Sequence, residues 1–396
     1  MFMKTVATVI VLSAVLSSGS AFAASQLPEP RKPQLGIDVI VDGMKATFPD
    51  TEPFFDDADR TMVPVRFVSE KLGAEVLWDN KAQIVTINYK GKVITMPVNS
   101  KVVTVDGVEQ TLDTSAILSE GRVVVPLRFV SETLDTIVKW DGSYNAITVS
   151  SKDFLDRIED GTIKVDTYGR KLRINTTSNI PKSAKDWQLL EDTENYAYDV
   201  AKPYTLPRDK ATMSAMEVLT QYTINKKSRD NIVMSIKNNY KLALNVDYRT
   251  IDASTYYKSS LSLYWKTGGT FPTEVLYRFV DFIKKNHVIT QGYAFPDANS
   301  LYRKNGEYFM RTKFKFKVIS SDDMSQFSMD SYNPSSYSES PDWVKKNQWY
   351  IGYADVRLDS NTSNYFIETL KMKNDENMFI LNGPKGSPAY SYKELK

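Results

Sequence analysis

The chain has 396 residues, of which 42% are hydrophobic and 25% are charged, a balance typical of soluble proteins with two or three globular domains. Fifty Lys and Arg residues against 48 Asp and Glu residues give a formal charge of +2, so no global excess of positive charge indicates a nucleic-acid partner. Cysteine is absent and His287 is the only histidine, which excludes disulfides, thiol nucleophiles, Cys/His zinc sites and multi-histidine metal centres.

Residues 1–23 have the three parts of a secretory signal peptide. Lys4 precedes an apolar run over residues 6–16, and residues 21–23 form a small-residue cleavage site. The run spans 11 residues, whereas a membrane-spanning helix needs about 20, so we expect cleavage after Ala23 rather than a retained anchor. The mature protein is therefore predicted to be secreted and extracellular, with association with the cell wall as a further expectation, residues 24–36 as a linker and no later membrane span.

A repeat organises the first 150 residues. Residues 60–88 (copy 1) align with residues 122–150 (copy 2) at a constant offset of 62, without a gap and with 13 identities in 29 pairs. The shared positions include a V-P-x-R-F-V-S-E-x-L block and a V-x-W-D block, and a Val-Asp-Gly triplet precedes each copy. The repeat unit is therefore longer than the aligned block.

Each copy predicts a short helix followed by a β-hairpin. In copy 1, Pro64 suits the first turn of a helix and Gly73 can end that helix with a positive φ. Residues 75–79 and 83–88 then have the pattern of two strands joined by a turn. Arg66 and Glu70 lie one helical turn apart, a spacing worth about 0.2–0.5 kcal/mol to a helix.

Trp78 and Trp140 occupy the same place in the two copies. Exposed tryptophans can stack on ligands, but a tryptophan retained at one position of a repeat is more simply a core anchor. We therefore predict that both side chains are buried.

An acidic loop, residues 56–59, lies just before copy 1 and offers carboxylate oxygens of the kind that bind calcium. It lacks both the glycine at the sixth place and the glutamate at the twelfth place of the twelve-residue calcium loop. A solvated hairpin is the favoured interpretation over a calcium site.

The R-x-x-V-P-[VL]-R-F-V-S-E-x-L block followed by V-x-W-D, present twice, resembles the copper amine oxidase N-terminal-like domain, also called the stalk domain. The resemblance covers about residues 37–151. It implies a repeat domain of antiparallel strands with short helices, which serves as a spacer or interaction module in exported proteins of Gram-positive bacteria. Asp135 replaces the helix-ending glycine of the pattern but tolerates the left-handed conformation, and the acidic loop at residues 56–59 is a second departure.

The resemblance does not bring the chemistry of the oxidase with it. A copper amine oxidase needs three histidine ligands and a quinone made from tyrosine, whereas this chain has one histidine. We therefore expect no amine oxidase activity, no cofactor, no metal site and no catalytic residue in the chain.

Residues 152–396 differ in composition from the repeat domain. Residues 24–151 contain 13 basic and 18 acidic residues, whereas residues 152–396 contain 36 basic and 30 acidic ones. Of the 23 tyrosines, 21 follow residue 151. We predict a separate, basic, tyrosine-rich α+β domain of no recognised family, so that the fold class of the whole chain is α+β.

The elements of this second domain follow from its apolar spacing. A period of 3.6 predicts three helices: residues 209–225, 228–239 and 271–286. Alternation predicts two strands: residues 307–319 and 348–358. We expect a surface loop over residues 320–340 and a frayed tail over residues 382–396, because both are rich in turn-forming residues.

His287 follows the predicted helix over residues 271–286, where a partial positive charge faces the negative end of the helix dipole. A Ser-His-Asp triad would have to use this single histidine, and no Gly-x-Ser-x-Gly motif accompanies it. We therefore expect a capping role rather than a catalytic one.

Four cations, Arg311, Lys313, Lys315 and Lys317, alternate along the predicted strand and so project from one of its faces. The favoured interpretation is a solvated edge strand on which lysines block strand addition. The other interpretation is a binding site for an anionic polymer. Both interpretations leave the four side chains in solvent.

Together these features predict an exported, non-catalytic protein of the bacterial surface or cell wall, in which a stalk-type domain precedes a domain that binds a ligand or partner. Its expected partners are cell-wall polymer or a surface protein. The alternative is an extracellular hydrolase of cell-wall polymer with catalytic residues in residues 152–396, since two carboxylates can converge in space without a sequence motif.

Overall fold

The computed structural model describes residues 27–30, 32–173, 197–198, 226–261, 273–304, 307–325, 327, 342–359, 371–372, 378–379 and 390–395. Residues 32–396 belong to one compact unit. The signal segment, the helix expected over residues 209–225 and most of the loop expected over residues 320–340 lie outside the described residues. Within the described part, no helix has both the length and the apolar character needed to cross a membrane.

Short strands and three short helices make up the N-terminal part. Its elements are, in chain order, β1 (Asp38–Val41), β2 (Met44–Lys45), β3 (Phe54–Phe55), β4 (Thr61–Pro64), α1 (Val65–Lys71), β5 (Glu75–Asp79), β6 (Ile84–Tyr89), β7 (Lys92–Pro97), β8 (Val102–Val105), β9 (Val108–Thr111), β10 (Ile117–Ser119), β11 (Arg122–Pro126), α2 (Leu127–Thr133), β12 (Thr136–Asp141), β13 (Ala146–Ser151) and α3 (Lys152–Glu159). They form three sheets with the strand orders β12-β13-β1-β2, β10-β11-β4-β3 and β5-β6-β7-β8-β9.

The predicted helix and hairpin occur in both copies. Pro64 is the N-cap of α1, and Gly73 has φ +85° just after the helix. Asp135 has φ +50° at the equivalent place after α2, so it adopts the left-handed conformation expected of it. Strands β5 and β6 then pair antiparallel, as do β12 and β13.

An approximate twofold axis relates the two copies. Strands β4 and β11 pair antiparallel with Val63 opposite Val125, and these two residues are equivalent at the offset of 62. On either side, Pro64 pairs with Val124 and Met62 pairs with Pro126, and a twofold rotation exchanges these two pairs. The axis therefore passes through the pair of Val63 and Val125. Val63 and Val125 are both fully buried, so the pair on the axis belongs to the core of the repeat domain.

The copies diverge at their ends. After β6, Lys90 and Gly91 both have positive φ, as a tight hairpin turn requires, and the chain returns as β7. The equivalent residues in copy 2 are Lys152 and Asp153, which begin α3, and Ser151 caps that helix by accepting the Phe154 N–H. With no counterpart of β7 in the way, β1 pairs directly with β13, in parallel.

The two tryptophans also differ, and the prediction that both are core residues was wrong for Trp140. Trp78 is half-buried against the core of the repeat domain. Trp140 is 48% exposed and makes an edge contact with Phe55, their ring centroids 5.5 Å apart. The sequence motif is shared, but the element that covers the ring is not.

The part that follows is helical first and then antiparallel. Its described elements are β14 (Leu172–Arg173), β15 (Ala197–Tyr198), α6 (Lys226–Ala243), α7 (Ala253–Leu261), α8 (Thr273–Lys285), β16 (Ile289–Lys304), β17 (Glu307–Ser320), β18 (Tyr350–Asp359), β19 (Lys371–Met372) and β20 (Tyr390–Glu394). The predicted helices at residues 228–239 and 271–286 are confirmed as α6 and α8, and the predicted strands as β17 and β18. The fold class is α+β.

Strand β17 lies between β16 and β18 in the sheet, so the prediction of an edge strand was wrong. The prediction of a frayed tail was wrong for residues 390–394, because β20 pairs antiparallel with β18. The outer side of β16 is covered in part by Asn245, whose side chain bonds both the N–H and the C=O of Gly292. This contact replaces a neighbouring strand at that point.

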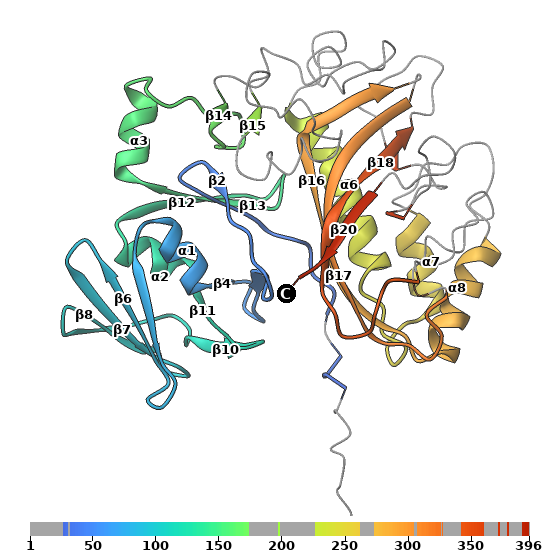
Figure 1. Cartoon of the computed structure of the whole chain (residues 1–396), viewed down its shortest axis with the longest axis horizontal. Coiled ribbons are helices and arrows are strands. Elements are labelled where there is room, and N and C mark those ends of the chain that lie inside the picture. The colour runs from blue at the N-terminus through green and yellow to red at the C-terminus, as the bar shows by residue number, and fades with distance from the viewer. Residues whose placement is uncertain are drawn as a thin grey trace, which may run out of the picture. The chain divides into compact units, whose positions relative to one another are not determined.

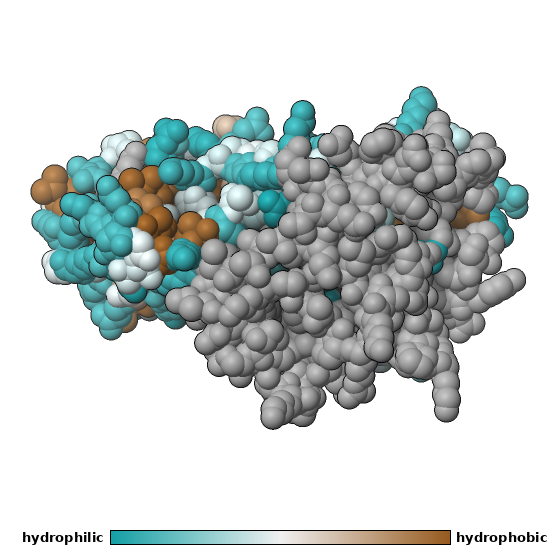
Figure 2. Space-filling model, turned by 90° about the horizontal axis from the view of Figure 1, so that it is seen from above, coloured by the Kyte–Doolittle hydropathy of each residue, from teal (hydrophilic) through white to brown (hydrophobic). Residues whose placement is uncertain are grey.

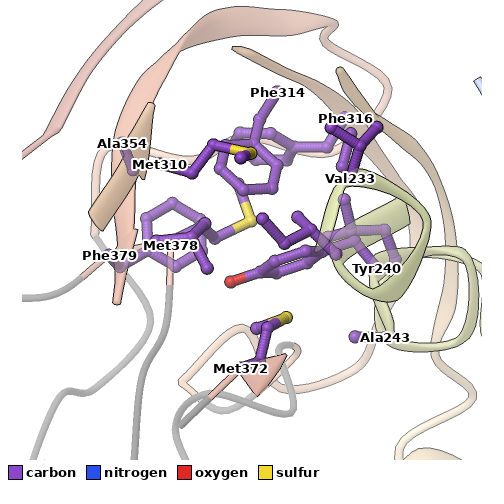
Figure 3. Packing of buried hydrophobic residues seen from close by; sticks show 14 of the residues in the cluster. Val233, Tyr240, Ala243, Met310, Phe314, Phe316, Ala354, Met372, Met378 and Phe379 are labelled. Carbon is purple, nitrogen blue, oxygen red and sulfur yellow. The ribbon is translucent and has the colours of Figure 1, made fainter. Parts of the chain in front are cut away.

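Helix α6 runs along the sheet formed by β16, β17 and β18 (Figure 1). Phe314 and Phe316 point from β17 toward this helix, and Tyr240 projects from α6 between Met372 and Met378 (Figure 3). The ring centroids of Tyr240 and Phe314 are 4.6 Å apart in an edge-to-face arrangement. The apolar face of β17 thus forms the core of this part.

Exposed apolar side chains concentrate on the repeat domain. Figure 2 shows hydrophobic residues among hydrophilic ones on its surface, at the left of the view. Of the nine large hydrophobic residues that are exposed in the described part, seven lie in residues 77–140: Leu77, Val93, Val102, Val108, Leu118, Ile137 and Trp140. They lie on six strands of this part: β5, β7, β8, β9, β10 and β12.

Candidate functional site

The polar face of β17 is covered by residues 36–52 of the N-terminal part. Lys315 is 1% exposed, and its Nζ donates to the carbonyl oxygens of Phe48 and Asp50, both at 3.0 Å. It also donates to Oε1 of Glu52 at 2.9 Å. A lysine from the C-terminal sheet therefore fills an oxygen-lined turn of the N-terminal part, so its charge is compensated without water.

This finding corrects the predicted surface of four solvated cations. Arg311 is 4% exposed and forms a bidentate pair with Asp355, its neighbour on β18, with N···O distances of 2.5 and 2.8 Å. Lys315 is buried as described, and Lys313 and Lys317 are half-buried. The sequence pattern placed the four on one face correctly, but that face packs against another part of the chain.

A second buried lysine joins α6 to the N-terminal part. Lys237 is 1% exposed, and its Nζ donates to Oδ2 of Asp38 at 2.7 Å. The same ammonium donates to the carbonyl oxygens of Tyr144 at 3.0 Å and Gly36 at 3.2 Å. Lys45 pairs with the other carboxylate oxygen of Asp38 at 2.7 Å. Lys237 of α6 and Lys315 of β17 therefore both bind the segment that contains residues 36–52.

Arg170 provides a third connection. Its guanidinium is 1% exposed and binds both oxygens of Asp297 on β16, at 3.0 and 3.1 Å, and Asp166 at 3.1 Å. Burial alone would lower the pKa of Arg170, but the two carboxylates hold it well above its ordinary value. Buried pairs of this kind cost several kcal/mol when one partner is removed, so they specify how the elements dock. We call the contacts made by Lys315, Lys237 and Arg170 the junction. The domain boundary at residue 151 remains a prediction.

Two carboxylates at the junction have pKa values displaced in opposite directions. Burial alone would raise the pKa of Asp38, but the ammonium groups of Lys237 and Lys45 outweigh it and lower that pKa to about 2. Burial raises the pKa of Glu52, an effect that Lys315 offsets only in part. Near neutral pH, Asp38 is therefore the more firmly ionised of the two.

A cavity of about 40 Å³ opens at the junction. Six charged side chains line it, three acidic and three basic: Asp38, Glu52, Asp297, Lys45, Arg311 and Lys313. Its apolar walls include Phe48, Phe295 and Tyr353. Phe295, Lys313 and Tyr353 are cross-strand neighbours on β16, β17 and β18, which explains how one row of the sheet forms one wall.

Ser143 and Lys226 form a separate polar cluster with two aspartates. The Ser143 hydroxyl lies 2.6 Å from an Asp141 carboxylate oxygen and 2.7 Å from an Asp230 carboxylate oxygen, and its single proton is donated to one of them at a time. Lys226 donates to the same two carboxylates at 2.7 and 2.8 Å. A serine beside a lysine suggests a nucleophile and its base. Although partial burial lowers the pKa of Lys226, its hydrogen bonds to the two aspartates raise that pKa overall, so Lys226 stays protonated and is unsuited to act as the base.

The structure describes His287 and the acidic loop at residues 56–59, two further features singled out from the sequence. His287 follows α8 with φ +50°, and its Nδ1 lies 2.6 Å from Oδ2 of Asp322. In the acidic loop, Asp56 accepts from the backbone N–H groups of Ala58 and Arg60 and from the Arg60 guanidinium. The loop is the turn of the β3–β4 hairpin, and the carboxylate oxygens of Asp56 are used in holding it.

Sequence reasoning missed the residues that make the junction, above all Asp38, Glu52 and Lys237. One signal was present for Asp38, because it is a carboxylate within the apolar run of residues 37–41. A charge inside a buried strand requires a buried partner. The sequence does not say which of the 50 basic residues that partner is.

Comparison with protein families gives one match. Residues 40–149 match the family model described as the copper amine oxidase N-terminal domain. This confirms the resemblance predicted for residues 37–151 and covers the three sheets of the repeat domain. A search of curated proteins finds no match for the chain.

Proposed function

We propose that this chain is an exported, non-catalytic protein of the bacterial surface. In this proposal the copper amine oxidase N-terminal-like domain and the C-terminal sheet together bind a ligand or partner. The observation that carries the proposal is the junction. Lys237, Lys315 and Arg170 are each almost completely buried and bind oxygens of another segment, so these three cations are engaged in holding the protein together.

Two observations support export and wall association. Residues 1–23 have the composition of a signal peptide, and the matched domain resembles modules expected in exported proteins of Gram-positive bacteria. The partner in this proposal is cell-wall polymer or a surface protein. In this proposal, two kinds of group contact the partner. One is the set of exposed apolar side chains of the repeat domain. The other is the half-buried Lys317, whose Nζ lies 4.6 Å from the ring centroid of Trp349.

One observation favours the alternative, a hydrolase of cell-wall polymer. Asp38 and Glu52 line the same cavity with pKa values displaced in opposite directions, a pattern typical of paired acid and base residues. Two facts weigh against it. Both carboxylates are already held by lysines, and a cavity of 40 Å³ is smaller than a sugar ring with its substituents.

The test separates export from catalysis. The protein expressed in a bacterial host should be recovered from the medium and wall with Ala24 as its first residue, and Leu12→Arg, which breaks the apolar run, should retain it in the cell. Purified protein incubated with cell walls should release no soluble sugars or peptides. Release that disappears in both Asp38→Asn and Glu52→Gln would establish the hydrolase instead.

A further inference from the structure

The size of the junction cavity restricts what can enter it. A cavity needs about 10–15 Å³ by this measure to hold one water, so 40 Å³ holds about three waters, or about 90 Å³ of liquid. The cavity therefore suits a ligand, or an enclosed part of a ligand, of only a few non-hydrogen atoms. Glycine and alanine, the smallest amino acids, are the amino acids that match this size best.

The charges of the cavity restrict the ligand further. A simple anion would lie beside the carboxylates that line the cavity, and a simple cation would lie beside its three basic groups. A ligand charge next to a side chain of the same sign is repelled, and this repulsion is stronger in a site that is partly shielded from water. A ligand that carries both charges can place each one near the opposite kind of side chain.

Three lining groups retain hydrogen-bonding capacity among the described residues. Glu52 uses Oε1 to bind Lys315, which leaves its Oε2 for a donor. Lys45 has three N–H donors and binds Asp38 with one of them. Thr47, whose side chain carries a hydroxyl, also lines the cavity. Three residues that line one small space therefore supply an acceptor and two donors.

We propose that the junction cavity binds a small zwitterionic amino acid, with the ligand ammonium on Glu52 and the ligand carboxylate on Lys45 and Thr47. The walls formed by Phe295 and Tyr353 accept a hydrogen or a methyl side chain and exclude larger ones. This proposal rests on the proposed function, because it names the ligand class of a non-catalytic binding protein.

Binding of this kind depends on the charge of Glu52. The charged groups that face it are Lys315 and Lys313 of β17, Asp38 of β1 and Lys45 of β2. Burial raises the pKa of Glu52, and a ligand ammonium beside it would favour the carboxylate form. Affinity should therefore fall as the solution is acidified through the pKa of Glu52, since protonated Glu52 no longer attracts the ammonium.

The test is titration calorimetry of the purified protein with glycine, L-alanine and D-alanine. Acetate and methylammonium, which each carry one charge, and leucine, which is too large, are the matched controls. We expect dissociation constants for glycine or alanine in the range of about 10 µM to 1 mM, as suits a ligand of this size, and binding of the controls at least tenfold weaker. Absence of saturable binding by all three amino acids, or equal binding of acetate, would overturn the proposal.

Variants locate the site. Lys45→Gln and Thr47→Val should each weaken binding of glycine or alanine about tenfold, as should Glu52→Gln if it folds. The control is Lys345→Gln, which removes an exposed ion pair with Glu394 and should leave affinity unchanged. Folded Lys45 and Thr47 variants that bind as tightly as the parent would refute the assignment. If the protein binds an amino acid but does not associate with the cell wall, only the proposed function is refuted. If it associates with the wall but binds no amino acid, only this inference is refuted.

Discussion

The two copies of the repeat share 13 of 29 aligned residues, yet their surroundings differ. Copy 1 continues into β7, which completes a five-stranded sheet. Copy 2 continues into α3, and its turn at Tyr144 and Asn145 receives Lys237 from α6. Shared residues therefore determine the local helix and hairpin, whereas the residues outside the shared set determine what the copy contacts.

A single side chain accounts for much of this difference. Asp38 lies four residues before the turn at Asp42, and the residue four before the equivalent turn at Asp106 is Val102. Asp38 is buried and holds two lysines, whereas Val102 is 41% exposed. Only the copy 2 side of the domain has the carboxylate that a buried lysine requires.

Breaking the Lys237 contact should have the largest effect. Lys237→Met removes one of the two ammonium groups that hold the buried Asp38, and we expect a loss of about 3–5 kcal/mol in the free energy of unfolding, measured with urea. Lys345→Met, which removes an exposed pair, should cost no more than about 0.5 kcal/mol. Equal losses for the two variants would show that the junction contributes nothing specific.

The two tryptophans test whether equivalent positions have equivalent roles. Trp78→Ala should cost about 2–3 kcal/mol because the ring packs against the core, somewhat less than for a fully buried aromatic. Trp140→Ala should cost less than about 1 kcal/mol, since it loses mainly the edge contact with Phe55. Thermal melts of both variants decide the question, and a larger loss at Trp140 would contradict the structure.

Acid titration should sharpen the comparison between Asp38 and Glu52. The pKa of Asp38 falls from 3.8 to about 2 on folding, so its stabilisation is present above pH 3.8 and is lost as the pH falls toward 2, a change of about 2 kcal/mol. The raised pKa of Glu52 acts in the opposite direction, because the folded state binds that proton more readily and gains stability as the pH falls toward 4.5.

The measurement is urea unfolding of the parent and of Asp38→Asn between pH 2 and pH 6. The variant should be less stable near neutral pH but should lose about 2 kcal/mol less than the parent between pH 4 and pH 2. Parallel pH profiles would mean that Asp38 does not carry this dependence.

The smallest effect concerns the ends of the two copies. Gly91 has φ +82° and open space around its α-carbon, so Gly91→Ala should cost about 1 kcal/mol through backbone conformation alone. Asp153→Ala, at the equivalent place in the first turn of α3, should cost about 0.5 kcal/mol. Calorimetric melts that rank the two variants in the reverse order would contradict this account of why the copies diverge.

The local structure of the repeat and the main elements of the C-terminal part could be predicted from the sequence. Pro64 and Gly73 bound α1, alternating apolar residues define β17, and the period of apolar residues defines α8, because these signals act between residues close in the chain. The failure at Trp140 has the same origin. A repeat motif specifies the ring's position on a strand but not the element that covers it.

The polar groups that are functional candidates could not be predicted in the same way. Arg311, Lys313, Lys315 and Lys317 share a strand face in either case, but whether that face meets water or residues 36–52 depends on contacts between segments more than 200 residues apart. The cavity likewise combines Lys45 and Glu52 with Lys313, whose proximity no sequence spacing encodes. Burial and pairing are properties of the packed chain, since a charge's partner is set by the geometry of docking and not by its neighbours in sequence.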